Sequence, residues 1–114
     1  MEIQIIKNPI SKNELAEIAK QRFGDLVKAV VDVNREIMAV GGNMYADEEA
    51  VLLGAGSRQS DLWGINIFPA FPISKWIEFD SVINIRPSDN NRSRGVENSE
   101  IRKRIIEIVN KLIK

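Results

Sequence analysis

Two strand-like segments joined by a very short connection constrain the fold of this chain most. Residues 26–33 alternate in character: Val27, Ala29, Val31 and Val33 share one face, and Lys28 and Asp32 lie on the other. Asn34-Arg35 is a plausible tight turn, and residues 36–40 then return as a second strand. Strands joined in this way pair antiparallel, so the sequence predicts a mainly antiparallel sheet.

A second pair of strands is expected in the C-terminal half, over residues 62–68 and 76–86. Pro69 and Pro72 lie between them and forbid a regular ladder there, because proline has no N–H to donate. One face of the later strand would carry Ile77, Phe79, Ile83 and Ile85. The other face would carry Trp76, Glu78, Asp80, Val82, Asn84 and Arg86. Residues 1–7 alternate weakly and could form a short edge strand.

Two longer segments have the apolar stripes of amphipathic helices. Ser11 and Glu14 form a capping box that begins the first helix, and Gly24 is expected just after its end. The buried face of this helix would comprise Leu15, Ile18, Ala19 and Phe23. The last helix is expected from the N-cap Asn98 to about Ile113, with a stripe of Ile101, Ile105, Ile108, Val109 and Leu112.

A shorter helix is expected between the two strand pairs. It would begin near Asp47, where acidic residues favour the positive end of a helix dipole, and stop near Gly54 or Gly56. The element order is then (β)αββαββα in a single domain over residues 1–114. We expect an α+β fold in which a four- or five-stranded, mainly antiparallel sheet carries three helices, mostly on one face.

The composition excludes several kinds of chemistry. The chain has no cysteine and no histidine, which rules out disulfides, Cys/His zinc sites and Ser-His-Asp or Cys-His catalytic pairs. Any acid–base group must therefore be Asp, Glu, Lys or Tyr, and any metal must be a hard ion held by oxygen, while the identity of a cofactor stays open. No apolar run reaches the roughly 20 residues of a membrane span, and the N-terminus lacks the pattern of a signal peptide. We expect a cytoplasmic protein.

The loop of residues 88–96 carries most of the functional information. It is rich in amide, hydroxyl and guanidinium groups and leads into the last helix, whose N-terminus attracts anions. The candidate ligand-binding residues are Asn84, Arg86, Asn91, Arg92, Ser93, Arg94 and Gly95. We expect a phosphate-bearing or other anionic ligand, with a nucleotide or RNA as the first candidates. In the alternative interpretation, Arg92 or Arg94 pairs with a buried carboxylate such as Asp80 and pins the loop to the sheet.

The charge distribution agrees with this interpretation, although the net charge is zero. Residues 86–114 hold eight Lys/Arg and four Asp/Glu, whereas residues 1–85 hold eight and twelve. The C-terminal quarter therefore has a charge of +4 and the remainder −4. A solvated, arginine-rich helix face would give the same distribution.

Carboxylates on the later strand suggest an alternative, enzymatic function. Glu78 and Asp80 are two residues apart and would point the same way, so they could hold Mg²⁺ or act as acid and base. Asn66 and Asp32 could join them from neighbouring strands. The lysine that often follows a strand carboxylate in nucleases is absent, and an ordinary solvated sheet face shows the same alternation.

The segment of residues 68–76 is unusually rich in aromatic residues and proline for a loop. A homodimer contact through Phe68, Phe71 and Trp76 is one interpretation, and a base-stacking platform or a lid over a pocket are others. A local mini-core beneath a long connection would explain the same residues.

Several segments together resemble a family of small prokaryotic proteins of unknown function. They are Leu62-Trp63-Gly64-Ile65-Asn66-Ile67, Trp76-Ile77-Glu78-Phe79-Asp80-Ser81, Asn91-Arg92-Ser93-Arg94-Gly95-Val96, and residues 47–50, 83–87 and 103–110. The resemblance covers nearly the whole chain and implies a stand-alone domain of about this size. It implies no activity and assigns no catalytic residues.

Overall fold

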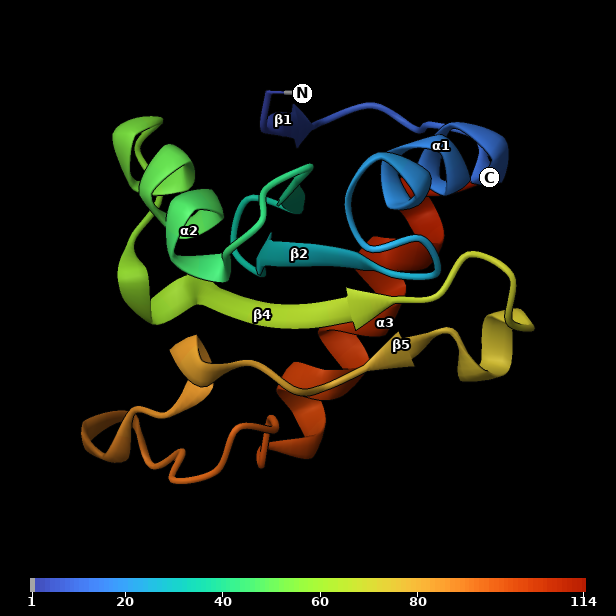
Figure 1. Ribbon diagram of the computed structural model, residues 1–114. Coiled ribbons are helices and arrows are strands. Elements are labelled where there is room, and N and C mark those ends of the chain that lie inside the picture. Colours follow the sequence, from blue (N-terminus) through green and yellow to red (C-terminus); the bar gives the residue numbers. More distant parts are fainter. Residues whose placement is uncertain (1) are drawn as a thin grey trace.

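In the computed structural model, residues 2–114 form a five-stranded antiparallel sheet with three α-helices (Figure 1). The strands are β1 (Gln4–Ile6), β2 (Val27–Asp32), β3 (Ile37–Val40), β4 (Leu62–Ile67) and β5 (Ile77–Glu78). The helices are α1 (Lys12–Arg22), α2 (Tyr45–Gly54) and α3 (Ser99–Leu112). The strand order is β1-β3-β2-β4-β5, so β1 is an edge strand, as predicted, with Met1 outside the described residues. The α+β class and the element order are confirmed.

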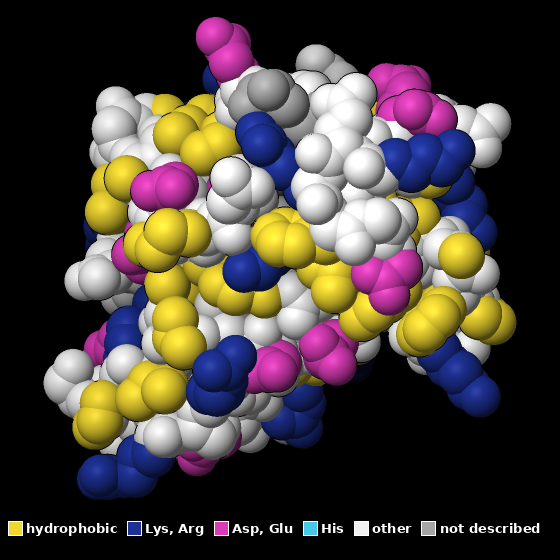
Figure 2. All heavy atoms as spheres, viewed as in Figure 1, with side chains coloured by type: hydrophobic (Ala, Val, Ile, Leu, Met, Phe, Trp, Pro, Cys, Tyr) yellow, Lys and Arg dark blue, Asp and Glu magenta, His cyan; other side chains and the backbone are white. Residues whose placement is uncertain are grey.

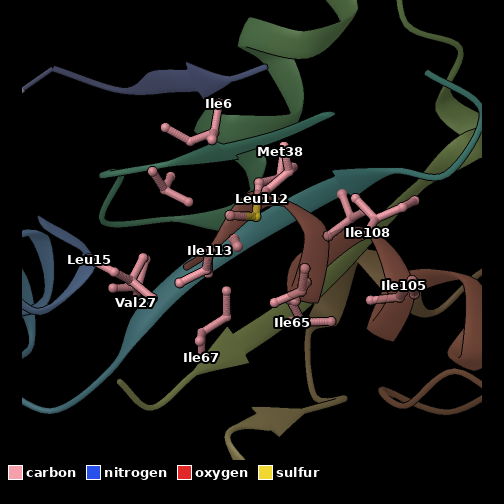
Figure 3. Close-up of a cluster of buried hydrophobic side chains, with 14 of the residues drawn as sticks. Ile6, Leu15, Val27, Met38, Ile65, Ile67, Ile105, Ile108, Leu112 and Ile113 are labelled. Carbon is pink, nitrogen blue, oxygen red and sulfur yellow. The ribbon is translucent and has the colours of Figure 1, made fainter. Parts of the chain in front are cut away.

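The alternation of side chains along β2 and β4 places two helices on one face of the sheet and one on the other. Side chains from α1 and α3 join one face of four strands in the larger hydrophobic cluster, part of which is drawn in Figure 3. The smaller cluster contains Tyr45 and Leu52 of α2 with Val30, Ala39 and Leu62 from the opposite face. On the same face, Lys28 and Asn66 lie in register beside the first turn of α2, and Asn66 is buried there by its contact with Tyr45.

The predicted helix ends are found at α1 and α3. Ser11 and Glu14 form the capping box before α1, and Gly24 follows that helix with a positive φ of 91°. Asn98 caps α3 by accepting hydrogen bonds from the N–H groups of its first turn. Helix α2 begins at Tyr45, two residues before the predicted start.

The connection between β2 and β3 differs from the predicted two-residue turn. Asp32 pairs with Ile37, so four residues form the loop, and Glu36 in the loop adopts a left-handed φ of 58°. The carboxylate of Asp32 explains this geometry, because its Oδ1 accepts hydrogen bonds from the N–H groups of Asn34 and Arg35, both at 2.9 Å. Asp32 is fully buried and holds the turn, so it does not join the carboxylates of the later strand.

The later strand is much shorter than the predicted residues 76–86. Its predicted faces hold at Ile77 and Phe79, which pack against the larger cluster, but they fail at Trp76 and Ile85. Pairing with β4 covers only Ile77 and Glu78, and a 3₁₀ turn, η3 (Val82–Asn84), follows. Trp76 lies in the larger cluster at 1% exposure, although its predicted face was polar. Ile85 was predicted to lie on the apolar face of the strand, but its side chain is 45% exposed. The chain leaves the sheet because the side chain of Asn84 takes over the hydrogen bonds that a strand would make to β4.

Candidate functional site

The loop of residues 88–96 is closed by a carboxylate of the chain itself. Glu97 Oε2 accepts hydrogen bonds from the backbone N–H groups of Arg92, at 2.6 Å, and Ser93, at 2.8 Å. The hydrogen bond from the N–H of Ser93, and next the one from Arg92, lower the pKa of Glu97 below its usual value. Asn98 accepts from the first-turn N–H groups of α3. The backbone donors that we expected to face an anion therefore have internal partners.

The two asparagines of the predicted site are buried and hold the backbone. Asn91 is 2% exposed, and its Nδ2 donates to the carbonyl oxygens of Asn84, at 2.7 Å, and Gly95, at 2.8 Å. Its Oδ1 accepts from the N–H of Glu97 at 2.8 Å. Asn84 donates to the carbonyl oxygens of Gly64 and Arg94, each at 2.9 Å. Both amides thus fix the path of the loop, a role that the loop's polar composition alone does not distinguish from ligand binding.

Arg86 contacts residues at the start of β4. Its Nη1 donates to the carbonyl oxygen of Leu62 at 2.8 Å, and its guanidinium lies 4.2 Å from the centre of the Trp63 ring. Nε lies 3.2 Å from the carboxylate of Asp89, and the side chain is only 10% exposed. These contacts hold Arg86 against β4 and Asp89, away from the ligand-binding role that we expected for it.

The remaining loop residues are near the surface. Arg92 is exposed, and its guanidinium makes no hydrogen bond or ion pair with any described residue. Ser93 Oγ accepts from the N–H of Gly95 at 3.2 Å. Arg94 pairs with Asp80 at 2.5 Å, and this hydrogen bond raises the pKa of Arg94. The arginines of the predicted site are therefore not gathered at one place: Arg94 pairs with Asp80, as the alternative interpretation predicted, and Arg92 has no such partner among the described residues.

Arg94 lies at a second group of polar residues, on the sheet face that carries α2. Lys28, Asn66 and Glu78 are neighbours in register across β2, β4 and β5. Asn66 Nδ2 donates to Glu78 Oε1 at 2.7 Å. The hydroxyl of Tyr45, from the first turn of α2, donates to Asn66 Oδ1 and lies 3.2 Å from the carbonyl oxygen of Asp80. Burial of this phenol raises the pKa of Tyr45 to about 12.

Lys28 is held in place by two aromatic rings. Its Nζ lies 4.8 Å from the ring centre of Phe23 and 4.8 Å from that of Tyr45. Within residues 2–114, this ammonium group makes no hydrogen bond and no ion pair with a carboxylate. It therefore presents N–H donors to its surroundings without an internal anionic partner.

A pocket of about 200 Å³ opens beside this lysine. Its lining comprises Lys28, Met44, Tyr45, Ala46, Val82 and Arg94. Figure 2 shows the face with α2, where basic and acidic side chains lie next to each other among hydrophobic ones. The two cations of the lining differ, because Arg94 is paired with Asp80 whereas Lys28 is unpaired.

The first turn of α2 contributes to the same pocket. Met44 is its N-cap residue and makes no side-chain cap, while its carbonyl oxygen accepts from the N–H groups of Asp47, at 3.2 Å, and Glu48, at 3.4 Å. Glu48, one turn further along, is fully buried, and burial raises its pKa to about 9. This carboxyl group is therefore protonated and neutral at pH 7 and does not offset the charge of Lys28.

The carboxylates that we considered for a metal have other partners. Asp80 accepts from Arg94 and Glu78 accepts from Asn66. Among residues 2–114, no group of three or more His, Cys, Asp or Glu side chains could hold a metal ion. No helix within the same residues is long and apolar enough to cross a membrane.

The aromatic segment is split between core and surface. Phe68 and Phe71 stack with ring centres 4.8 Å apart, and Phe71 is 47% exposed. Trp76 is buried in the larger cluster, so its ring is not available to a dimer contact. A groove of about 490 Å³ lies beside this segment, lined by Ile73, Ser74, Ile77, Phe79, Ile106 and Asn110.

Sequence reasoning missed Lys28, Tyr45 and Ala46 as possible site residues. The alternation of β2 placed Lys28 opposite the apolar face, but only the pairing of β2 with β4 brings it beside Asn66. The earlier start of α2 then brings Tyr45 over this row. A lysine on the polar face of a central strand is the one signal in the sequence that could have pointed to this site.

Comparison with known proteins places the whole domain in one family. A family model described as a protein of unknown function, DUF5674, matches residues 4–112. No curated protein and no solved structure matches the chain. The match agrees with the resemblance noted in the sequence, and it assigns no site.

Proposed function

The chain belongs to the DUF5674 family of proteins of unknown function, and from the geometry of the pocket we propose that it binds a small anionic ligand there. The anionic group would contact Lys28, with Arg94 and the first turn of α2 around it. This proposal keeps the ligand class and one arginine expected from the sequence. It moves the binding site from the loop of residues 88–96 to the neighbouring sheet face.

The single observation that carries the proposal is the unpaired ammonium group of Lys28. Contacts with the faces of Phe23 and Tyr45 hold the side chain, but an aromatic face does not satisfy the N–H donors as a carboxylate would. A cation fixed in position, partly shielded from water and lacking a counterion favours an anion more strongly than a freely solvated lysine does. The electrostatic attraction would weaken with added salt.

Arg94 supplies a second cation that can change partner. Its side chain is 54% exposed and that of Asp80 is 44% exposed, so their ion pair is an exposed one of modest strength. A ligand carboxylate or phosphate could take one edge of the guanidinium while Asp80 keeps the other. A carboxylate and a phosphate could each bind the two cations in this way, and the phosphate could belong to a nucleotide or to RNA.

The test is a binding measurement on the lysine variant and a matched control. Calorimetry and melting curves would be recorded with inorganic phosphate, adenosine monophosphate, a short RNA and small carboxylates at two salt concentrations. For whichever anion binds, Lys28→Gln is expected to lower the affinity at least tenfold. Lys103→Gln, on the exposed surface of α3, should leave it unchanged. Equal binding by Lys28→Gln and the parent protein would contradict the proposal.

A further inference from the structure

We infer that the ligand of this pocket is a small acid with an apolar body, such as a short-chain or aromatic carboxylic acid, an inference that rests on the proposed function. The evidence for an apolar ligand body is the hydrophobic rim of the pocket. Met44 and Val82 both line it and are both 56% exposed, which is high for large hydrophobic side chains. Phe23, which contacts Lys28 from the other side, is 39% exposed. Exposed hydrophobic side chains therefore share the pocket lining with the cation.

Apart from the two cations Lys28 and Arg94, the polar groups beside the pocket are already hydrogen-bonded within the protein. The hydroxyl of Tyr45 donates to Asn66, and the amide of Asn66 donates in turn to Glu78. Glu48 is buried and accepts from the N–H of Gly42 at 3.1 Å. A sugar or a base edge would need free donors and acceptors in fixed positions, whereas an alkyl chain or phenyl ring needs only apolar contact.

The size of the pocket points the same way. Its volume of about 200 Å³ is below the roughly 300–1,000 Å³ of pockets that enclose drug-sized ligands. A six-carbon acid or benzoate is suited to such a space, whereas most of a nucleotide would remain outside it. The head group would meet Lys28, and the carbon chain would lie against Met44 and Val82.

The inference predicts a dependence on chain length. Acetate, butyrate and hexanoate carry the same head group, and each methylene buried in the pocket is expected to raise the affinity about fourfold until the pocket is full. Val82→Ser and Met44→Gln should each weaken hexanoate binding several-fold while changing acetate binding little. Ile106→Ser, which exchanges a comparably exposed hydrophobic residue on α3, is the matched control and should change neither.

Nuclear magnetic resonance titrations of the parent protein and these variants would test the inference. Hexanoate binding that depends on chain length, on Val82 and on Lys28 would support it. Equal affinity for acetate, hexanoate and inorganic phosphate, each lost in Lys28→Gln, would overturn the inference and leave the proposed function standing. Tighter binding of adenosine monophosphate than of hexanoate would also overturn the inference of an apolar ligand body while the proposed anion binding stands. Hexanol binding as tightly as hexanoate, or no anion responding to Lys28→Gln, would overturn both.

Discussion

Asn84 and Gly64 form hydrogen bonds in both directions. The N–H of Gly64 donates to Asn84 Oδ1 at 2.8 Å, and Asn84 Nδ2 donates to the carbonyl oxygen of Gly64 at 2.9 Å. A side-chain amide thus pairs with the central part of β4, where the next strand of the sheet would otherwise pair. The approach is close, because a Cβ placed on Gly64 would lie 2.4 Å from Ser81 Oγ.

Substitutions at these two positions should destabilise the fold. Gly64→Ala forces a methyl group against Ser81, and Asn84→Ala leaves a buried N–H and a buried carbonyl oxygen without partners. We expect each variant to lower the free energy of unfolding by about 2–4 kcal/mol. Urea unfolding followed by circular dichroism measures this. Asn110→Ala, at an exposed asparagine of α3, should change the free energy of unfolding by less than about 0.5 kcal/mol. A loss in Asn110→Ala as large as that in Asn84→Ala would contradict the structural role of the Asn84–Gly64 contact.

Glu48 should make the protein less stable as the pH rises. Burial raises its pKa to about 9, far above the value of about 4.5 of an exposed glutamate. Between these two values the unfolded chain has released the proton and the folded protein keeps it, so stability falls with increasing pH. The fall from this single group approaches about 1.4 kcal/mol per pH unit at most.

The variant Glu48→Gln isolates this effect. The amide oxygen can still accept from Gly42, and no proton is taken up or released at this position. We expect the stability of the variant to vary less between pH 5 and pH 9 than that of the parent protein, and the two curves to diverge toward alkaline pH. Parallel curves for the two proteins would show that Glu48 is ionised in the folded state.

Glu97 should behave in the opposite way. Hydrogen bonds from Ser93 and Arg92 lower its pKa, so its contribution is present above the pKa of the unfolded chain and is lost as the pH falls through the folded value. The amide signals of Arg92 and Ser93 should therefore titrate together with a midpoint below 4.5. Glu97→Gln should abolish this titration, and amide signals that still titrate in the variant would rule out the contact.

Tyr45 provides a direct test of the packing at the pocket. It is the one tyrosine of the chain, so ultraviolet absorbance follows its ionisation without interference from another phenol. We expect a midpoint near 12 in the folded protein, because burial raises the pKa to about 12. A midpoint near 10 would mean that the hydroxyl is exposed to water and not bonded to Asn66.

Tyr45→Phe separates the hydroxyl from the ring. The substitution leaves Asn66 Oδ1 without the phenol donor, and we expect a loss of about 1–3 kcal/mol in the free energy of unfolding. The ring that contacts Lys28 is retained, so anion binding should persist. Loss of binding without loss of stability would show instead that the hydroxyl itself contacts the ligand.

Local signals in the sequence were sufficient for most of the architecture. The capping box at Ser11, the cap at Asn98 and the apolar stripes of α1 and α3 each act over a few residues, so periodicity and end signals identify them. The later strand failed because alternation alone does not tell which residues pair. In the sequence, Asn84 fits the alternation of a strand, because its contact with Gly64, twenty residues earlier, leaves no local signal.

The site was harder to predict because its polar residues are partnered across long stretches of chain. The loop of residues 88–96 has the composition of an anion site, yet Glu97 supplies the anion from within. Lys28 and Tyr45 are seventeen residues apart and meet only after β2, β3 and α2 have assembled. Arg94 and its partner Asp80 were both named in the alternative interpretation of the sequence, but the pocket beside them depends on the tertiary fold.

The most direct test of the proposed function is to locate the bound anion by its effect on the backbone amides. A ¹⁵N-labelled sample would be titrated with hexanoate and, in parallel, with inorganic phosphate. The largest shifts are predicted at Lys28, Tyr45 and Ala46, around the pocket. Largest shifts at Arg92 and Ser93, or small shifts scattered over the surface, would contradict a binding site at Lys28.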